Sequence, residues 1–510
     1  MAKLTPKFAP QPSQLEMQPI LHFFNTGKLA DAEAAAKKLA ARYPQALILH
    51  QVLGLSLDGL GRYADAVESY TNALAIQPNT PDLHFNLGIA QANLGNVEAA
   101  EKSYLQAIKL QPRFFEAHGN LGTVLQKQGR LEQAIVSYQT ALSIHEDARG
   151  HFNLATALRD TGKLDDAISH FERAIALFPN YVDAHNYLGE CYRDQGNMDD
   201  AINKYLEALA LNPNHAGANY NMGEFLYLAG RFDEAADYLE RSQLDDWRER
   251  ALYCTYKAQH FVAFKSKLDD IVQANTKHTA PFLQTLSTHY ATNFGVEDRY
   301  NFCKNGFDFV YQKSITELAE PNSQFLSDLL RDIENTAIET RAQAMVINGK
   351  QSAGNLFKRP EASFRKLAEI VKQEFIHYKN KFAGADCELI KSFPQTLEFT
   401  SSWYVRLRRG GFVDRHIHEV GWISGAVYLV LPKDCKDPLE GCFEYGLHGD
   451  NYPQQHQNFP TGIASLKVGD IVLFPSSLFH RTIPFNSNEE RICIAFDLKP
   501  EGDIFFRSSY

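Results

Sequence analysis

The first half of the chain repeats with a period of about 34 residues, and this period constrains the fold more than any other feature. A three-residue motif that ends in a small residue recurs at steps of 34, 34, 33, 34 and 34, at residues 52–54, 86–88, 120–122, 153–155, 187–189 and 221–223. An alanine follows in phase, at Ala32, Ala66, Ala100, Ala134, Ala167, Ala201 and Ala235. Because both markers keep one phase, we predict six to seven copies of one structural unit across residues 15–245.

Each unit has the signals of two helices joined by a tight turn. Small residues such as Gly88 and Ala100 allow two antiparallel helices to approach closely. Glycines suited to the left-handed position after a helix recur at the expected turn, at Gly95, Gly129, Gly162, Gly196 and Gly230. A proline ends most units, at Pro44, Pro78, Pro112, Pro179 and Pro213, with the one expected near position 146 missing.

This pattern resembles the tetratricopeptide repeat (TPR). The resemblance implies an α-helical solenoid whose concave groove holds a protein or peptide. A spacer or a dimerisation surface is the alternative. Amides near the inner-helix positions could clamp a peptide backbone, since each offers a donor and an acceptor, or they could be solvated helix surface. These residues are Asn86, Asn120, Asn153 and Asn221 in phase, and Asn186 one residue out of phase.

The remaining chain divides into three further parts. We expect residues 1–14 to be disordered and residues 246–320, where the repeat markers vanish but helical spacing persists, to be degenerate helices that cap the array. Helices are predicted over 324–344 and 361–381, with a loop over 349–355 between them. Seven short strand-like segments follow, at 397–406, 422–431, 442–445, 462–467, 470–474, 481–485 and 491–498. Residues 321–510 therefore predict an antiparallel β-sandwich or jelly roll supported by helices, so the whole chain is an α+β multidomain protein.

The strand-rich part carries one set of residues with the chemistry of a metal site. His416 and His418 lie two positions apart, so on a strand they point to one face, and His480 follows a distant strand. Three ligands on one side leave positions open for O2 and a co-substrate. Arg491 begins the polar side of a strand whose other side is apolar, so we expect it inside the roll, where a buried guanidinium needs an anionic partner.

In order along the chain, these residues form a longer motif. His-x-His is followed by Ser-Gly-x-x-Tyr-Leu at 424–429, Gly-Asp-x-x-x-Phe-Pro at 469–475, a histidine and an arginine. From Trp403 to Leu498 this set resembles the Fe(II)- and 2-oxoglutarate-dependent oxygenases. The resemblance implies a double-stranded β-helix (jelly roll), with His416 and His480 as iron ligands and Arg491 bound to the far carboxylate of 2-oxoglutarate. It also implies Fe(II) (Fe2+), 2-oxoglutarate and O2 as cofactor and co-substrates, with ascorbate as a further candidate.

One position departs from the broader superfamily, which has Asp or Glu where this chain has His418. Three interpretations stay open. His418 is a third metal ligand, or it contacts the co-substrate beside a two-histidine site, or Asp414 or Glu419 turns in as the missing carboxylate. A cupin-type metal site is less favoured, because Trp422 and Ile423 stand where its first motif needs Glu.

Several aromatic and basic residues give weaker signals. Tyr404 and Tyr428 are candidates for co-substrate binding, and Arg406 and Trp422 for substrate binding, although aromatic residues at strand spacing are more often core. The Gly/Asn/Gln-rich segment 446–462 is long enough to be a lid.

Composition limits the classes of partner. A net charge of −10 argues against a nucleic-acid binder held by phosphate contacts and gives no reason to expect an anionic membrane surface. Seven scattered cysteines without a C-x-x-C pair favour a reducing cytoplasm. We therefore predict a cytoplasmic 2-oxoglutarate-dependent dioxygenase that hydroxylates a protein or peptide side chain recruited by the repeats. The alternatives are a non-catalytic TPR scaffold with a degenerate jelly roll, or a cupin-type metal dioxygenase.

Overall fold

The computed structural model describes residues 10–244, 247–273, 281–335, 340–341, 345–393, 397–419 and 421–500. The chain separates into two compact units, residues 1–219 and 220–510. The disorder expected for residues 1–14 falls mostly outside the described residues. Among the described residues, no helix combines the length and the apolar character needed to cross a bilayer.

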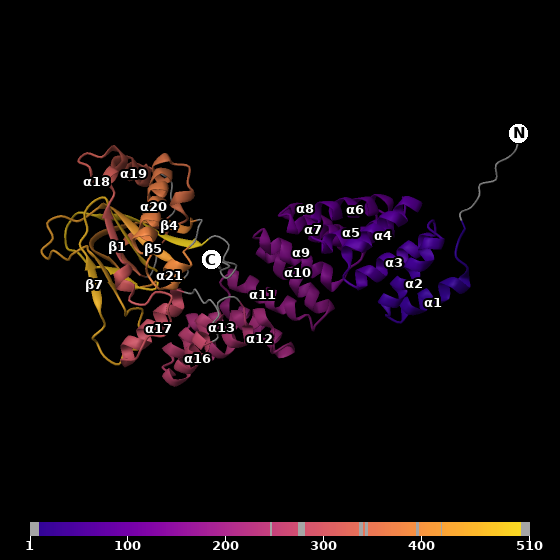
Figure 1. Cartoon of the computed structure of the whole chain (residues 1–510), viewed down its shortest axis with the longest axis horizontal. Helices are drawn as coiled ribbons and strands as arrows, with labels where there is room; N and C mark the ends of the chain where they lie inside the picture. The colour runs from indigo at the N-terminus through magenta and orange to yellow at the C-terminus, as the bar shows by residue number, and fades with distance from the viewer. Residues whose placement is uncertain are drawn as a thin grey trace. The chain divides into compact units, whose positions relative to one another are not determined.

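The described part of the first unit is a stack of antiparallel helix pairs (Figure 1). The helices are α1 (Gln14–Asn25), α2 (Leu29–Arg42), α3 (Leu47–Gly59), α4 (Tyr63–Ile76), α5 (Pro81–Asn93), α6 (Val97–Leu110), α7 (Phe115–Lys127), α8 (Leu131–Ile144), α9 (Ala148–Asp160), α10 (Leu164–Leu177), α11 (Val182–Asp194) and α12 (Met198–Leu211). Each pair corresponds to one sequence repeat, which confirms the predicted helical solenoid.

Small residues fix the spacing within each pair. A Cβ added to Gly122 in α7 would lie 2.6 Å from Cε1 of Tyr138 in α8, and Gly54, Gly88 and Gly189 meet a tyrosine in the same way. The turn residue Gly129 has a φ of +73°, a conformation that favours glycine. The glycines of the motif therefore make room for a tyrosine ring that recurs on the neighbouring helix. The sequence markers alone did not predict this contact.

The unit without a proline is also the one that is a residue shorter. Asp147 takes over as the N-cap of α9, where its side chain accepts a hydrogen bond from the backbone N–H of Gly150. A capping carboxylate satisfies a free N–H at the helix start, so the helix begins in register without proline.

The second unit begins with helices and continues into strands. Helix α13 (Ala216–Leu228) crosses the boundary between the units, and α14 (Phe232–Ser242), α15 (Trp247–Lys257), α16 (Phe261–Gln273) and α17 (Pro281–Phe294) follow. The remaining helical elements are η1 (Gly306–Phe309), α18 (Thr316–Ala319), α19 (Gln324–Asn335), η2 (Leu356–Lys358), α20 (Ala362–Lys381) and α21 (Glu388–Lys391).

The strands form two antiparallel sheets. They are β1 (Tyr311–Ser314), β2 (Thr340–Arg341), β3 (Val346–Ser352), β4 (Leu397–Val413), β5 (Ile423–Val430), β6 (Phe443–Gly446), β7 (Thr461–Ala464), β8 (Asp470–Pro475), β9 (Phe479–Thr482) and β10 (Arg491–Pro500). The larger sheet has the order β1-β8-β5-β10-β4-β3-β2 and the smaller one the order β7-β6-β9. Buried side chains of both, such as Val405, Tyr428, Phe443 and Phe474, share one core cluster. This arrangement is consistent with the predicted jelly roll.

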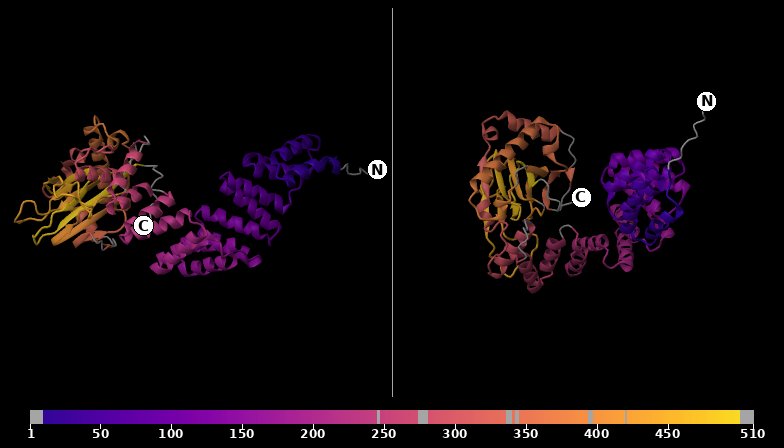
Figure 2. Two further views of the ribbon diagram at one scale, coloured as in Figure 1. Left: turned by 90° about the horizontal axis from the view of Figure 1, so that it is seen from below. Right: turned by 45° about the vertical axis from the view of Figure 1, so that its right-hand side comes forward.

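Helix α20 covers the outer face of the larger sheet (Figure 2). Phe375 of α20 packs with its ring centroid 6.0 Å from that of Phe496 in β10 and 6.3 Å from that of Phe399 in β4. The apolar side of β10 is therefore used for helix packing, and its other side faces the interior of the roll.

Three local predictions were wrong. Tyr311–Ser314, inside the region expected to be helical, is strand β1 and pairs with β8. The expected loop 349–355 begins inside strand β3, which pairs with β4. The helix expected over 324–344 ends as α19 at Asn335. The two strands are short and polar, and they owe their structure to hydrogen bonds with longer strands rather than to local propensity.

Candidate metal centre

Two segments far apart in sequence bring three histidines together. The segment after β4 is tied to β9 by a backbone pair, in which His416 N donates to His480 O (3.1 Å) and His480 N donates to His416 O (3.0 Å). The ring centroids of His416, His418 and His480 lie 4.2 to 5.1 Å apart. One potential ligand atom from each of the three lies within 4.8 Å of the others.

Hydrogen bonds at Nδ1 define which nitrogen of each ring is free. His416 Nδ1 lies 2.7 Å from the carbonyl oxygen of Asp414, and His480 Nδ1 lies 3.2 Å from that of Leu478. His418 Nδ1 bonds a carboxylate oxygen of Asp497. Carbonyl and carboxylate oxygens only accept, so each Nδ1 donates its proton to that partner, and Nε2 is left as the candidate ligand atom of each ring.

Two of these nitrogens are close together. Nε2 of His416 lies 3.1 Å from Nε2 of His418. This is a hydrogen-bond distance, so a proton or a metal ion can be shared between the two nitrogens. The donor set of three neutral imidazoles suits a first-row transition metal, so the residues present fit an Fe(II) ion.

The surroundings of His416 and His480 keep these two imidazoles unprotonated. Burial, and then the neighbouring His418, lower the pKa of His416 to about 4. Burial, followed by His416 and His418, holds the pKa of His480 well below its ordinary value. At neutral pH both rings are available as ligands, and any bound cation competes with few protons.

Asp497 belongs to the site and was not among the predicted residues. It is buried near the end of β10, and its carboxylate also accepts hydrogen bonds from Ser424 Oγ (2.7 Å) and Ser401 Oγ (3.0 Å). Burial alone would raise the pKa of Asp497, but the charge and hydrogen bond of His418, with the two hydroxyls, hold that pKa below its ordinary value. The sequence does contain one signal for Asp497: it lies an even number of residues after Arg491 on the same strand, so both side chains are expected on one face.

Arg491 lies inside the roll, as the alternation along β10 predicts. Its side chain is 2% exposed. Nε donates to the carbonyl oxygen of Gly441 (2.9 Å), Nη1 lies 3.7 Å from Cys493 Sγ, and the guanidinium carbon lies 5.0 Å from the ring centroid of Tyr428. Within the described part of the chain, no carboxylate forms an ion pair with it. A buried cation in this state is suited to an anionic ligand.

Small side chains line the inner face of β10 between the two groups. Cys493 and Ala495 stand between Arg491 and Asp497, and Ala495 pairs with Ala426 of β5 on one side and Trp403 of β4 on the other. The indole of Trp403 is half-buried and lies 5.6 Å, between ring centroids, from His418.

Of the other predicted contacts, only Tyr428 joins this face. Tyr404 and Arg406 alternate with the inward Trp403 and Val405 of β4, so they point to the opposite face. Arg406 pairs there with Glu490 at 2.7 Å and Glu334 at 3.3 Å. The structure does not bring these two residues to the histidines.

Trp422 also lies away from the histidines. Its indole N–H donates to the carbonyl oxygen of Leu389 (3.1 Å), and its ring packs against Phe302 with centroids 4.8 Å apart. Its role is to join β5 to the helical support.

The two alternative carboxylates are engaged elsewhere. Asp414 Oδ1 accepts from the backbone N–H of Arg415 (2.7 Å), and Glu419 Oε1 accepts from the hydroxyl of Tyr227 in α13 (3.4 Å). His418, rather than either carboxylate, occupies the third position of the cluster.

The segment predicted to be a lid is fastened to the helices that precede the roll. His448 Nδ1 lies 2.8 Å from His289 Nε2, and Lys257 Nζ donates to the carbonyl oxygens of Asp450 (2.7 Å) and Asn451 (3.2 Å). Asn293 donates to Pro453 O (3.0 Å) and accepts from Gln455 N (2.7 Å). His456 lies 3.1 Å from the carbonyl oxygen of Thr292. These contacts hold the segment closed against α15 and α17.

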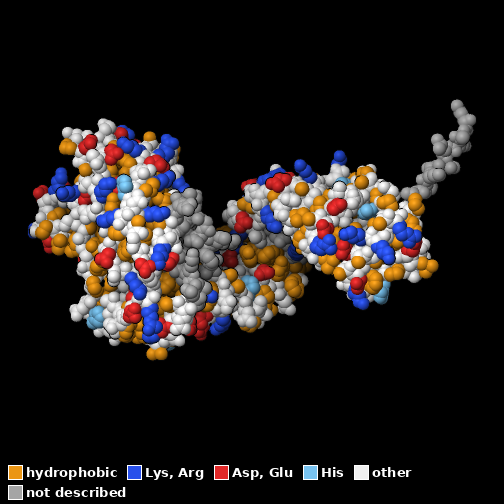
Figure 3. Space-filling model, in the orientation of Figure 1, with side chains coloured by type: hydrophobic (Ala, Val, Ile, Leu, Met, Phe, Trp, Pro, Cys, Tyr) orange, Lys and Arg blue, Asp and Glu red, His pale blue; other side chains and the backbone are white. Residues whose placement is uncertain are grey.

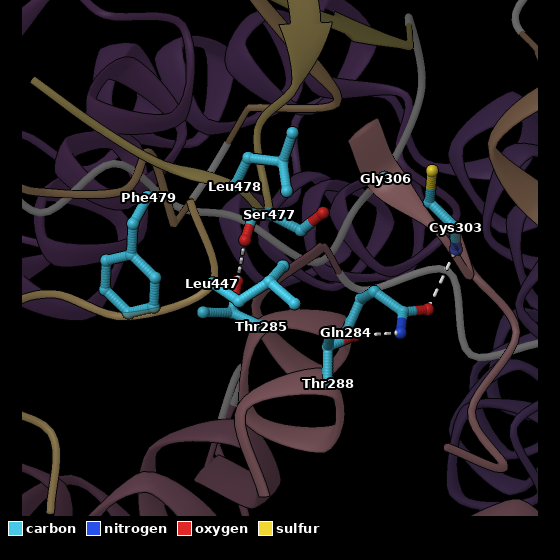
Figure 4. A pocket seen from close by; sticks show the side chains of 9 residues that line it. All are labelled: Gln284, Thr285, Thr288, Cys303, Gly306, Leu447, Ser477, Leu478 and Phe479. Atoms are coloured by element: carbon cyan, nitrogen blue, oxygen red, sulfur yellow. Dashed lines mark hydrogen bonds between the residues drawn. The ribbon is translucent and has the colours of Figure 1, made fainter. Parts of the chain in front are cut away.

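A small cavity lies between residues of α17 and the segment 477–479 (Figure 4). Its volume is about 10 Å³, room for roughly one water molecule. It is lined by Gln284, Thr285, Thr288, Cys303, Gly306, Leu447, Ser477, Leu478 and Phe479. Thr285 Oγ1 donates to the carbonyl oxygen of Ser477 (2.8 Å), which anchors the segment that leads into His480.

The amides of the repeats differ in their surroundings. Asn86, Asn120 and Asn153 are half-buried, whereas Asn186 and Asn221 are buried. The Asn186 amide donates to Glu190 (3.0 Å).

On the face seen in Figure 3, basic and acidic side chains are interspersed over both units.

Comparisons with known proteins agree with the two parts of the chain. Residues 401–497 match the family model described as "Putative 2OG-Fe(II) oxygenase". Models of the tetratricopeptide repeat match residues 59–95, 93–129, 113–180, 152–216 and 192–248. The chain therefore carries tetratricopeptide repeats followed by a C-terminal domain of this oxygenase family.

Several solved structures are similar to part of the chain. They include MamA 41-end from Desulfovibrio magneticus RS-1 (23% identity, 33% of this chain, 95% of that chain, TM-score 0.32). YrrB, titled a TPR protein with an unusual peptide-binding site, is 22% identical over 36% of this chain and 95% of its own, with a TM-score of 0.32. A tetratricopeptide repeat protein from Parabacteroides merdae ATCC 43184 is 19% identical over 45% of this chain and 91% of its own, with a TM-score of 0.40. No curated protein matches the chain.

Proposed function

We propose that this protein is an Fe(II)- and 2-oxoglutarate-dependent dioxygenase that oxidises a side chain of a protein or peptide. The observation that carries the proposal is a cluster of three histidines, with one potential ligand atom of each within 4.8 Å of the others, in the same roll as a buried arginine that lacks a carboxylate partner among the described residues. The match of residues 401–497 to the oxygenase family supports it.

His416, His418 and His480 would hold the metal. Their Nδ1 hydrogen bonds orient the rings, so little ordering is left to be done when the ion binds. When bound, Fe(II) supplies the redox chemistry that couples O2 to the oxidative decarboxylation of 2-oxoglutarate, giving succinate and CO2, and to oxidation of the substrate. Three ligands from one side leave the remaining coordination positions for co-substrate and O2.

Arg491 would bind the far carboxylate of 2-oxoglutarate. A guanidinium fork matches a carboxylate in geometry and charge, and burial strengthens the pairing. The ring of Tyr428 and the carbonyl oxygen of Gly441 hold the guanidinium in place. Cys493 and Ala495 have small side chains, so little projects from the inner face of β10 between Arg491 and the histidines.

The repeats would recruit the substrate. Stacked helix pairs present a concave surface suited to an extended peptide. The half-buried amides of Asn86, Asn120 and Asn153 are the candidates for clamping its backbone, since each is partly accessible. A protein or peptide substrate fits this arrangement better than a small molecule.

Succinate formation by the purified full-length protein tests the proposal. With Fe(II), O2 and 2-oxoglutarate, we expect succinate in the wild type and at least a hundredfold less in His480→Ala, because one of three ligands is lost. His377→Ala is the matched control, since this histidine is exposed on α20. Absence of both metal binding and succinate in the wild type would refute the proposal and leave a repeat scaffold.

Partners captured by the His480→Ala variant would identify the substrate. Mass spectrometry of these partners, before and after incubation with the wild type, should show added oxygen on one side chain. Captured partners that gain no oxygen would contradict the proposed role of the repeats in substrate recruitment.

A further inference from the structure

The three histidines are oriented by chemically different partners. His416 and His480 each give the Nδ1 proton to a backbone carbonyl oxygen, of Asp414 and Leu478. His418 alone gives it to a carboxylate, that of Asp497. The exception falls at the one position where the broader oxygenase superfamily has a carboxylate ligand.

Several contacts of the fold hold Asp497 against His418. Asp497 is 9% exposed and stands on the inward face of β10, seventy-nine residues from His418. Hydroxyls from β4 and β5, of Ser401 and Ser424, hold its two oxygens. A Cβ added to Gly421 would lie 3.3 Å from the carboxylate, so the chain is close on that side too.

The charge of the site explains why this matters. A carboxylate ligand offsets one of the two positive charges of Fe(II), whereas three neutral imidazoles offset none. A carboxylate that accepts the Nδ1 proton of a ligating histidine makes the imidazole more basic and more anionic in character. Its negative charge also stays within one ring of the metal, in a buried setting where charges interact strongly.

We propose that Asp497 is a positioning residue that supplies, through His418, the negative charge that a carboxylate ligand supplies in related sites. This inference rests on the proposed metal site and deepens it. It assigns Asp497 a role that other buried residues of β10, such as Cys493, do not have.

The test measures Co(II) affinity by absorption titration of the full-length protein, without turnover. Four proteins are compared: wild type, Asp497→Asn, His418→Asp, and the double variant. Asn keeps an oxygen that accepts from Nδ1 and removes the charge; its NH2 takes the place of the oxygen that accepts from Ser401, so Ser401→Ala controls for that bond. In the wild-type background we expect Asp497→Asn to weaken Co(II) binding by about 10- to 100-fold.

The effect should be much smaller in the second background. In His418→Asp the ligand itself is a carboxylate, and Asp497 no longer accepts an Nδ1 proton from a ligating histidine. Asp497→Asn should therefore weaken Co(II) binding much less in this background than in the wild type. An equal loss in both backgrounds would overturn the inference, because it would show that Asp497 only supports the fold.

Two further measurements keep the outcomes distinct. Ser401→Ala removes a hydrogen bond to Asp497 but leaves the charge, so we expect less than a threefold change; a loss as large as that of Asp497→Asn would also overturn the inference. If His418→Asp does not fold, this comparison with Ser401→Ala decides. A wild type that binds no Co(II) would instead overturn the proposed metal site itself.

Discussion

Replacing Arg491 by Met separates the two roles that a buried arginine can have. Arg491 is 2% exposed, and its guanidinium makes one short hydrogen bond, to Gly441, and a cation–π contact with the ring of Tyr428. Burying a charge costs several kcal/mol. A charged hydrogen bond returns about 1.5–3 kcal/mol and a buried cation–π contact about 2 kcal/mol. These contributions nearly cancel, so we expect the unliganded variant to lie within about 2 kcal/mol of the wild type.

Ligand binding should respond very differently. Removing the cation that pairs with a buried carboxylate costs about 2–5 kcal/mol, which corresponds to an affinity loss of about 30- to 4,000-fold. Anaerobic denaturant unfolding with Fe(II), with and without 2-oxoglutarate, measures both quantities. The wild type should gain stability with the ligand, and Arg491→Met should gain almost none.

Arg406→Met is the matched control, because Arg406 is a strand arginine that already has carboxylate partners, Glu490 and Glu334. As its side chain is 29% exposed, it should lose less than about 1 kcal/mol and keep the full response to 2-oxoglutarate. A loss of more than about 4 kcal/mol in unliganded Arg491→Met would contradict the expectation for that variant, because it would exceed the difference between the cost of burying the charge and the stabilisation from its contacts. Stabilisation of Arg491→Met by 2-oxoglutarate to the same extent as the wild type would also contradict it.

Three further predictions concern packing, pH and the lid segment. Gly122→Ala should destabilise the repeats by about 1–3 kcal/mol in denaturant unfolding, because its Cβ meets Tyr138, whereas Gly119→Ala in the same helix meets nothing and should gain up to about 1 kcal/mol; equal effects would show that Gly122 does not make room for Tyr138. Burial, with His448 next, lowers the pKa of His289 from 6.5 to about 3. The unfolded chain therefore takes up the proton first, and the stability that His289 contributes above pH 6.5 should be lost at about 1.4 kcal/mol per pH unit toward pH 3, in addition to the loss from the buried His416 and His480. His289→Gln should lower the slope by that amount, and an unchanged slope would show that other groups are responsible. Asn293→Ala should speed hydrogen exchange in residues 447–460, because it removes two bonds to that segment; unchanged exchange would show that the other contacts suffice.

The parts of the fold that could be predicted are those with a local signal. A helix pair repeats its packing contacts in every unit, so the period is visible without knowledge of the tertiary structure. The seven strand segments of the roll could also be predicted, because their side chains alternate and turn residues separate them. Strands β1 and β3 do not, because their residues become strands only by pairing with β8 and β4.

The candidate site divides in the same way. His416, His418, His480 and Arg491 could be found, because each stands at a recognisable place in an ordered motif. Asp497 could not be assigned, since an aspartate near the end of a strand usually faces water, and only the partner seventy-nine residues away gives it a role. Tyr404 was predicted to bind co-substrate, because the sequence does not show which face of β4 points inward. The structure places Trp403 and Val405 on the inner face.

The sequence by itself determined the helical repeat, the strand-rich second part and the residue types of a metal site. These follow from periodicity and from chemistry that a few side chains carry alone. Only the tertiary structure decided that three imidazoles meet, that Asp497 bonds His418 and that α15 and α17 hold the lid segment. Those facts depend on contacts between residues far apart along the chain, and such contacts leave no periodic trace in the order of the amino acids.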